Sequence, residues 1–371
     1  MTQQLEPVFA DLRKARLALN LTEEQLDRAM VLGPGWIEGI ESGRIIPDLS
    51  LFVALCSHLQ VAPSKILSKV AAFDSALSIA RTISAVTSDK GITVHFQYAE
   101  HSASYEIPNA SLAEFEEVIL CLRDGLADSK AQKAEAVVRS YQKAVGLWPH
   151  VNPSDIWWFV IYRAFTDAYN HPASRYGGDY AQSWIRTSGW ALERVFVENY
   201  APKLAKHGIR IAIEGSAEKK SLLAQLKTKV PLNVDKADVI LSVVNKDGTL
   251  TCFGVVHVKA SFAERRTDDE PMSRLLIDSG YCSPLLTMDC KSGPSASPVN
   301  RGELASASGE RSDKRKDIEV SGVFSGCFSF NARTEETTDA NALSLVRVCD
   351  FTSADDSFVS HVKEMATKFR K

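Results

Sequence analysis

The sequence predicts a protein of the α/β (α+β) class that begins with a small all-α domain. Up to about residue 67, apolar residues recur at helical spacing between tight turns. In the second half, a long amphipathic helix over 183–208 precedes short apolar runs of strand length, which turn residues separate. A chain of 371 residues is long enough for two or three domains. We place them at residues 1–70, 71–150 and 151–371.

The composition excludes several classes of protein. The formal net charge is −3, so contact with nucleic acid would have to come from local patches. Seven cysteines without a CxxC pair argue against a disulfide framework and a zinc ribbon, and fit reduced thiols in a cytoplasmic protein. No apolar run approaches the roughly 18 residues of a membrane helix, and the first residues lack the apolar stretch of a signal peptide. We expect a cytoplasmic protein without a membrane partner.

The first segment predicts four short helices. Thr22 followed by Gln25 is a capping box that opens a helix. A turn at 33–35 leads into the next helix, and Pro47 prevents that helix from continuing. The pieces LTEEQLDRAM, WIEGIESGR and PDLSLFVALCSHLQVAPSKIL, with their spacing, resemble the helix-turn-helix domain of lambda-repressor-like proteins.

That resemblance implies DNA binding through the helix around Pro34 to Glu41. Acids and glycines stand there at positions where arginine, glutamine or serine would reach bases, namely Gly35, Glu38, Gly39 and Glu41. Two interpretations therefore stay open for this domain: it contacts DNA, or it serves as a docking or dimerisation module.

The middle segment predicts a small α+β or linker region. GITVHFQYAEHSASYEIP alternates well enough for two strands with a turn at Glu100–Ala103. SLAEFEEVILCLRDGLA and KAQKAEAVVRSYQKAVGLW then predict two helices, and neither carries residues that suggest chemistry. PSDIWWFVIYRAFTDAYN follows as a thick apolar helix whose tryptophans we expect to pack in the core.

An acid and a lysine lie on neighbouring predicted strands of the last segment. Asp238 precedes the run VILSVV, and Lys259 ends the run LTCFGVVHVK; an Asn-Lys-Asp-Gly hairpin signal joins them. Glu193 lies at the margin of the apolar stripe of the preceding helix. This is the arrangement of the PD-(D/E)xK nucleases. Carboxylates bind Mg²⁺ through oxygen, the metal activates water, and a desolvated lysine orients or deprotonates that water.

Several separated blocks extend the similarity. HVKASFAERRTDDEPMSRLLIDSGYCSPLLTMDCKSGP resembles the BsaWI-type family of type II restriction endonucleases, relatives of enzymes that cut CCGG-containing sites. SGWALERVF, KADVIL and GVFSGCFSFNART agree in the same order, so the resemblance covers most of residues 180–335. It implies a restriction-endonuclease-like core with a mixed central sheet flanked by helices, and a Mg²⁺ cofactor.

The resemblance assigns roles residue by residue. Asp238 matches the metal-binding aspartate and Lys259 the catalytic lysine. His257 stands where the simple motif has an acid, and we expect it to support or pack rather than to bind metal. CCGG cutters often recruit the missing acid from the following helix, which implies Glu270, or its neighbours Asp268 and Asp269, with support from Glu193. The implied catalytic set is Asp238, Lys259, Glu193 and Glu270, and its three acids are the implied metal ligands.

A recognition element follows the lysine in that family, as K-x-S-x-R and then an acid and an arginine. Ala263 replaces its first arginine here, so an interrupted or flanked CC…GG site is possible. Glutamate can accept from cytosine N4, and arginine can bind guanine O6 and N7. The implied DNA-recognition residues are Ser261, Glu264, Arg265 and Arg266.

Residues 291–317 are rich in Ser, Gly, Pro and charge, and predict a long mobile loop. Its basic residues either track the DNA backbone or are simply solvated. They are Arg301, Arg311, Lys314, Arg315 and Lys316.

The leading prediction is a Mg²⁺-dependent type II restriction endonuclease that cuts double-stranded DNA at a palindrome with a CCGG or interrupted CC-GG core and leaves 5′-phosphates. Cutting two antiparallel strands implies a homodimer, and such a system includes a cognate DNA methyltransferase. The alternative is a helix-turn-helix transcriptional regulator with a non-catalytic C-terminal sensing domain. A third possibility is a repair or mobile-element nuclease on the same core, which would cut without a fixed sequence.

Overall fold

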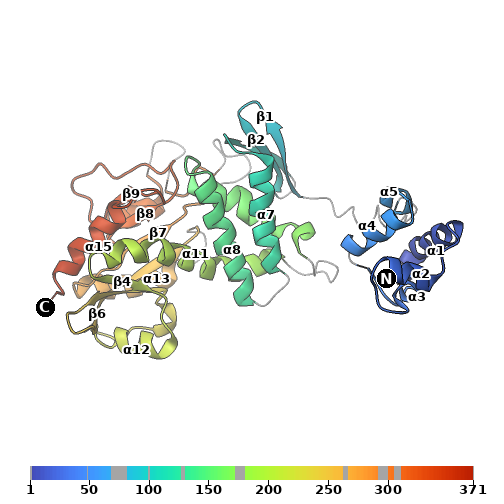
Figure 1. Ribbon diagram of the computed structural model, residues 1–371. Coiled ribbons are helices and arrows are strands. Elements are labelled where there is room, and N and C mark those ends of the chain that lie inside the picture. The colour runs from blue at the N-terminus through green and yellow to red at the C-terminus, as the bar shows by residue number, and fades with distance from the viewer. Residues whose placement is uncertain are drawn as a thin grey trace. The chain divides into compact units, whose positions relative to one another are not determined.

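The chain forms two compact units, Met1–Arg81 and Thr82–Lys371. The structure is a computed structural model (Figure 1). It describes residues 2–47, 49–67, 82–98, 101–126, 130–171, 180–261, 266–290, 300–304 and 311–370. Each unit has a hydrophobic core of its own and is described separately.

The N-terminal unit is all-helical, as predicted. Its helices are α1 Thr2–Ala18, α2 Glu23–Ala29, α3 Trp36–Glu41, α4 Leu49–His58 and α5 Pro63–Leu67. The capping box is present, since Thr22 Oγ1 accepts from the Gln25 amide and the Gln25 side chain accepts from the Thr22 amide. Asp27 caps α3, because its carboxylate accepts from the amides of Gly35 and Ile37 at 2.9 Å each. The helix-turn-helix geometry is therefore fixed by side-chain caps at both helices.

An ion pair inside this unit changes the interpretation of α3. Arg16 on α1 donates to both carboxylate oxygens of Glu41, at 2.6 and 2.7 Å, and the two side chains are 5% and 6% exposed. Gly39 is also buried, and the Ile45 side chain fills the space that a Cβ at this position would need. Glu38 is exposed and pairs with Arg44. The prediction that Glu41 presents an acid to DNA is wrong, because this carboxylate faces inward.

The buried pair predicts a contrast between the two glutamates of α3. Glu41→Ala should destabilise the N-terminal unit by about 3–5 kcal/mol, since it leaves the buried Arg16 guanidinium without its main partner. Glu38→Ala is the matched control and should cost at most about 0.5 kcal/mol, because its pair is exposed. Hydrogen exchange of α1 and α3 peptides in the full chain measures both. Equal loss of protection in the two variants would contradict the structural role of Glu41.

The C-terminal unit begins with a three-stranded antiparallel sheet of order β1-β2-β3. The strands are β1 Ile83–Ser88, β2 Gly91–Tyr98 and β3 His101–Pro108. The sequence predicted β2 and β3 but missed β1, whose Ser, Thr and Ala residues give a weak strand signal. The predicted turn at Glu100–Ala103 is too late, because His101 already pairs with Tyr98. Helices α7 Leu112–Leu126 and α8 Lys130–Leu147 follow and pack side by side (Figure 1).

The apolar segment after α8 is not one uniform helix. It divides into α9 Pro153–Asp155, a π-helical turn Ile156–Ile161, α10 Tyr162–Thr166 and a 3₁₀ turn Ala168–Asn170. Trp157 within it is fully buried, which confirms that this tryptophan belongs to the core. A π turn closes its hydrogen bonds over five residues and not over four, so it interrupts the regular α-helix at this point.

A six-stranded mixed sheet follows, with order β4-β5-β6-β7-β8-β9. The first three strands are antiparallel, and β6 to β9 run parallel. The strands are β4 Ile209–Ala212, β5 Val239–Val244, β6 Leu250–Lys259, β7 Leu285–Thr287, β8 Cys327–Ser329 and β9 Val346–Val348. The helices of this part are α11 Tyr180–Ala205, α12 Ser216–Leu223, α13 Arg266–Asp278, α14 Asp313–Glu319 and α15 Ser357–Thr367.

Alternate residues of the central strands pack into different hydrophobic clusters. Val239 and Leu241 of β5 join the cluster that contains α11 and α15, whereas Ile240 joins the cluster of α12 and α13. Since strand side chains alternate between the two faces of a sheet, helices cover both faces. The predicted mixed sheet flanked by helices is confirmed.

The main hydrophobic core also shows which residues belong to one compact unit. One cluster runs from Ile83 to Ala366 and includes residues of β1, α7, α8, α11 and the central sheet. Contacts therefore join residues 82–371 in a single unit, whereas the sequence suggested a boundary near residue 150. In the described part of the chain, no helix is both long and apolar enough to span a membrane.

Candidate active site

The β5–β6 hairpin brings Asp238 and Lys259 together. Val239 at the start of β5 lies opposite Val256 of β6. Asp238, one residue earlier, therefore lies beside the end of β6, where its Oδ2 accepts from the Val258 amide at 3.2 Å. Lys259 Nζ lies 3.7 Å from the same oxygen, and the two side chains are 23% and 19% exposed. The lysine ends its strand next to a carboxylate rather than in bulk water.

A second carboxylate comes from α13. Asp269 Oδ2 lies 2.7 Å from Lys259 Nζ, and the Asp269 side chain is 5% exposed. Glu270 points elsewhere and pairs with Arg274 one helical turn later, at 2.9 Å. Successive helix residues differ by about 100° in direction, so only one of these neighbours can face Lys259. The structure thus brings Asp269 into the cluster in place of Glu270, and the side chain of Asp268 lies outside the described residues.

The charges explain the protonation of Lys259. Burial acts to lower its pKa, but the nearby charges of Asp238 and Asp269, together with the Asp269 hydrogen bond, outweigh burial and raise the pKa above its ordinary value. Lys259 therefore carries its positive charge at neutral pH.

Glu193 on α11 belongs to the same electrostatic environment. Burial raises the pKa of its carboxyl to about 8, and the charge of Asp238 adds to the rise. Lys219 and Lys259 act in the opposite direction. Without a metal ion, Glu193 is thus protonated at neutral pH.

Two further residues stand next to the cluster. Lys219 on α12 donates to the Ala237 carbonyl at 2.7 Å, and so supports the backbone that carries Asp238. No sequence pattern indicated it. His257 is fully buried two residues before Lys259, and one of its ring nitrogens lies within 4.8 Å of carboxylate oxygens of both Asp238 and Asp269. Among the described residues, these three side chains form the candidate group for holding a metal ion.

Comparison with known proteins identifies the family. A curated relative, the type II restriction enzyme AgeI of Thalassovita gelatinovora, is 36% identical over 244 residues, which are 63% of this chain and 84% of AgeI. The chain belongs to the AgeI family of type II restriction endonucleases. The solved structure of AgeI agrees with this. The specific AgeI–DNA complex matches with a TM-score of 0.65 and 31% identity, over 74% of this chain and 99% of that one.

Two other similarities concern parts of the endonuclease. The helix-turn-helix family HTH_3 matches residues 12–66, which confirms the predicted N-terminal domain. The pre-specific BsaWI–DNA complex matches with a TM-score of only 0.34 and 16% identity, over 69% of this chain and 93% of that one, so the assignment depends on AgeI. The predicted class, a type II restriction endonuclease with an N-terminal helix-turn-helix domain, is confirmed.

The predicted recognition segment lies largely outside the described part of the endonuclease. Glu264 and Arg265 fall within 262–265, which is not described. Ser261 lies two residues after the end of β6 and is half-buried. Arg266 is the first residue of α13, and its side chain is not described. The segment thus connects the end of β6 to α13, between the residues that carry Lys259 and Asp269.

The basic residues near 311–317 are engaged within the chain. Residues 313–319 form α14, capped by Ser312, so this part is a helix and not the predicted loop. The ion pairs are Arg311 with Glu319, Lys314 with Glu303, Arg315 with Glu319, and Lys316 with Asp313. Residues 291–299 and 305–310 lie outside the described residues. These four cations are therefore compensated, which weakens the prediction that they track a DNA backbone.

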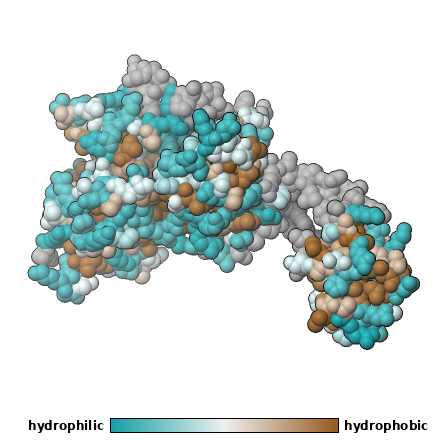
Figure 2. All heavy atoms as spheres, turned by 45° about the horizontal axis from the view of Figure 1, so that its top comes forward, coloured by the Kyte–Doolittle hydropathy of each residue, from teal (hydrophilic) through white to brown (hydrophobic). Residues whose placement is uncertain are grey.

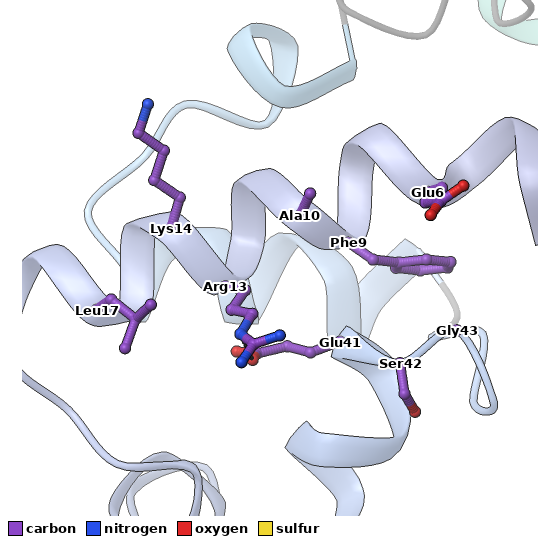
Figure 3. Close-up of a pocket in the computed structure, with 9 residues that line it drawn as sticks. All are labelled: Glu6, Phe9, Ala10, Arg13, Lys14, Leu17, Glu41, Ser42 and Gly43. Atoms are coloured by element: carbon purple, nitrogen blue, oxygen red, sulfur yellow. Dashed lines mark ion pairs between the residues drawn. The ribbon is translucent and has the colours of Figure 1, made fainter.

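A pocket lies in the N-terminal unit and not at the cluster of Asp238, Lys259 and Asp269. Residues of α1 form one side of it, and residues 41–43, at the end of α3, form the other (Figure 3). Figure 3 shows Arg13 of α1 pointing at Glu41, the residue that Arg16 also binds. Because Glu41 serves the helix packing, we assign this pocket no chemistry.

The raised pKa of Glu193 predicts a pH dependence of stability. The folded metal-free endonuclease keeps this carboxyl protonated up to about pH 8, whereas the unfolded chain ionises it near 4.5. The free energy of unfolding should therefore fall as pH rises between these two values. The linkage relation limits the loss to about a few kcal/mol. Glu193→Gln should remove this part of the dependence. Denaturant midpoints in EDTA at about pH 5 and about pH 8 measure it, and identical pH dependence in both proteins would contradict the assignment.

Proposed function

We propose that the endonuclease hydrolyses double-stranded DNA with Mg²⁺ at the Asp238–Lys259–Asp269 cluster. The observation that supports this most is the position of the Lys259 ammonium, 2.7 Å from Asp269 and 3.7 Å from Asp238. Two partly buried carboxylates beside one lysine are the groups that metal-dependent phosphodiester hydrolysis requires. The complex of AgeI with DNA supports DNA as the ligand.

The donor set suits a divalent cation. Carboxylate oxygens of Asp238 and Asp269 lie within 4.8 Å of each other, close enough for both to bind one ion. Mg²⁺ prefers such oxygen ligands. When bound, it supplies a water of lowered pKa and neutralises charge on the phosphate. In our proposal Asp238 and Asp269 hold it, and Asp269 takes the role that the sequence gave to Glu270.

The remaining groups have distinct tasks in this proposal. Lys259 lies beside both carboxylates, where it can orient the attacking water and stabilise the negative charge of the phosphate oxygens. Glu193 holds a proton in the metal-free site and can release it when a cation approaches. Glu193 thus supports the site as a third acid, and Lys219 keeps the Asp238 backbone in place.

In our proposal, the segment after Lys259 recognises the base sequence. We propose a palindromic site with a CCGG or interrupted CC-GG core, read by Ser261, Glu264, Arg265 and Arg266. Glutamate and arginine are suitable partners for C·G pairs in the major groove. A palindrome presents the same half-site twice, so two copies of the chain would act together as a homodimer. The cut ends would carry 5′-phosphates. A methyltransferase of the same specificity would protect the host DNA.

The N-terminal unit is not required for catalysis in our proposal. The AgeI structure is covered to 99% by 74% of this chain, so about a quarter of this chain has no counterpart in it. The helix-turn-helix face is also unsuited to bases: Glu38 lies on it, and Val31 is 91% and Trp36 40% exposed. Figure 2 shows several hydrophobic residues on the visible surface of this unit. These features favour docking or dimerisation over base reading.

The two neighbouring acids of α13 give the sharpest test of the catalytic cluster. Asp269→Asn should reduce Mg²⁺-dependent cleavage by more than about 100-fold. Loss of a residue that only supports a metal ligand already costs up to about 100-fold, and Asp269 would bind the metal itself. Glu270→Gln is the matched control and should keep near-normal activity, because Glu270 faces Arg274. Single-turnover cleavage of a plasmid by both variants measures this. The reverse order of the two effects would return the catalytic role to Glu270.

Deleting residues 1–81 tests the role of the N-terminal unit. The remaining unit has its own core, so it should stay folded and cut the same sequence as the full chain. Sequencing the ends of a digested plasmid compares the two proteins. A relaxed set of cleavage sites after the deletion would mean that the helix-turn-helix domain contributes to base reading.

A further inference from the structure

His257 occupies the place of the acid that the simple nuclease motif would have. It lies on β6 two residues before Lys259, and therefore on the same face of the sheet, because strand side chains alternate. The ring is fully buried and packs against Phe324, with ring centroids 5.4 Å apart. One ring nitrogen lies within 4.8 Å of oxygens of Asp238 and Asp269. A nitrogen thus converges on the two carboxylates that we assign to the metal.

The hydrogen bonds behind His257 fit a ring that carries its proton on Nε2. Nε2 lies 3.0 Å from Ser283 Oγ, and that hydroxyl lies 2.8 Å from Ser273 Oγ. Ser283 can accept from the Nε2–H and donate onward to Ser273, so each of these groups finds a partner. Histidines that bind metal usually donate their other ring N–H to such an oxygen, which fixes the tautomer.

The second nitrogen is then available. Nδ1 is buried, and no described residue forms a hydrogen bond with it. With the proton on Nε2, Nδ1 carries a lone pair. Lys259 compensates the two carboxylates, but Nδ1 stays a buried acceptor with no described donor, which is unfavourable unless a further cation binds there.

We propose that His257 is a nitrogen ligand of the metal site formed with Asp238 and Asp269, and that the site therefore binds Mn²⁺ more tightly than Mg²⁺. This inference rests on the proposed metal-dependent function. Imidazole nitrogen suits transition metals, whereas Mg²⁺ takes oxygen ligands almost exclusively. Replacing the acid of the motif by histidine changes one ligand from oxygen to nitrogen, and Asp269 restores the second carboxylate from α13.

The test is pulsed electron paramagnetic resonance of Mn²⁺ bound to the full chain labelled with ¹⁵N-histidine. We expect a hyperfine coupling from a directly bound ¹⁵N, and its loss in His257→Gln. His361→Gln is the matched control, because His361 is also a histidine bonded to a serine, Ser325, but is not part of the cluster. That variant should retain the coupling.

Equilibrium titrations provide a second readout. His257→Gln should weaken Mn²⁺ binding by about 10–100-fold and Mg²⁺ binding less, so that the preference for Mn²⁺ decreases. If the variant does not fold, the labelled wild-type protein decides the question alone. Mn²⁺ binding that requires Asp238 but shows no ¹⁵N coupling would overturn the role of His257 and leave the proposed function intact. Mn²⁺ binding that is unchanged in Asp238→Asn would instead overturn the metal site itself.

Discussion

The ammonium group of Lys259 is the point at which β5, β6 and α13 of the C-terminal unit bring their charged side chains together. It ends β6 between a carboxylate from the start of β5 and another from α13. The antiparallel register of the hairpin and the Val258 amide hold Asp238 in place, while the Ala237 carbonyl is tied to Lys219 of α12. Removing charges from water is costly unless each charge is compensated, so these elements must all be correctly placed before the lysine can be partly buried.

Compensation of buried charge has a structural role in the N-terminal unit. The side chains of the Arg16–Glu41 pair are less exposed than those of Lys259 and Asp238, and both of its charges are satisfied within the unit. The catalytic cluster instead combines three acceptors, Asp238, Asp269 and His257, with a single ammonium, and leaves Glu193 protonated. A closed ion pair stabilises a fold, whereas an excess of acceptors around one cation creates a site for another.

The hairpin signal was sufficient to predict the neighbourhood of Asp238 and Lys259, because a four-residue turn fixes which ends of two strands meet. It could not distinguish Asp269 from Glu270. That choice depends on where α13 begins, and a shift of one residue turns a side chain by about 100°. The inward direction of Glu41 was equally hidden, since its partner Arg16 lies on a different helix. Local patterns thus predicted the elements and the adjacent strands, while contacts between distant segments selected the side chains.

The most direct test of the central claim is digestion of a plasmid of known sequence by the full chain, with and without Mg²⁺, followed by sequencing of the ends. We predict Mg²⁺-dependent cuts at one palindromic sequence with a CCGG or interrupted CC-GG core, all with 5′-phosphates. Cleavage at unrelated sequences, cleavage in EDTA, or tight binding of one operator without any cleavage would contradict a metal-dependent, sequence-specific nuclease centred on Lys259.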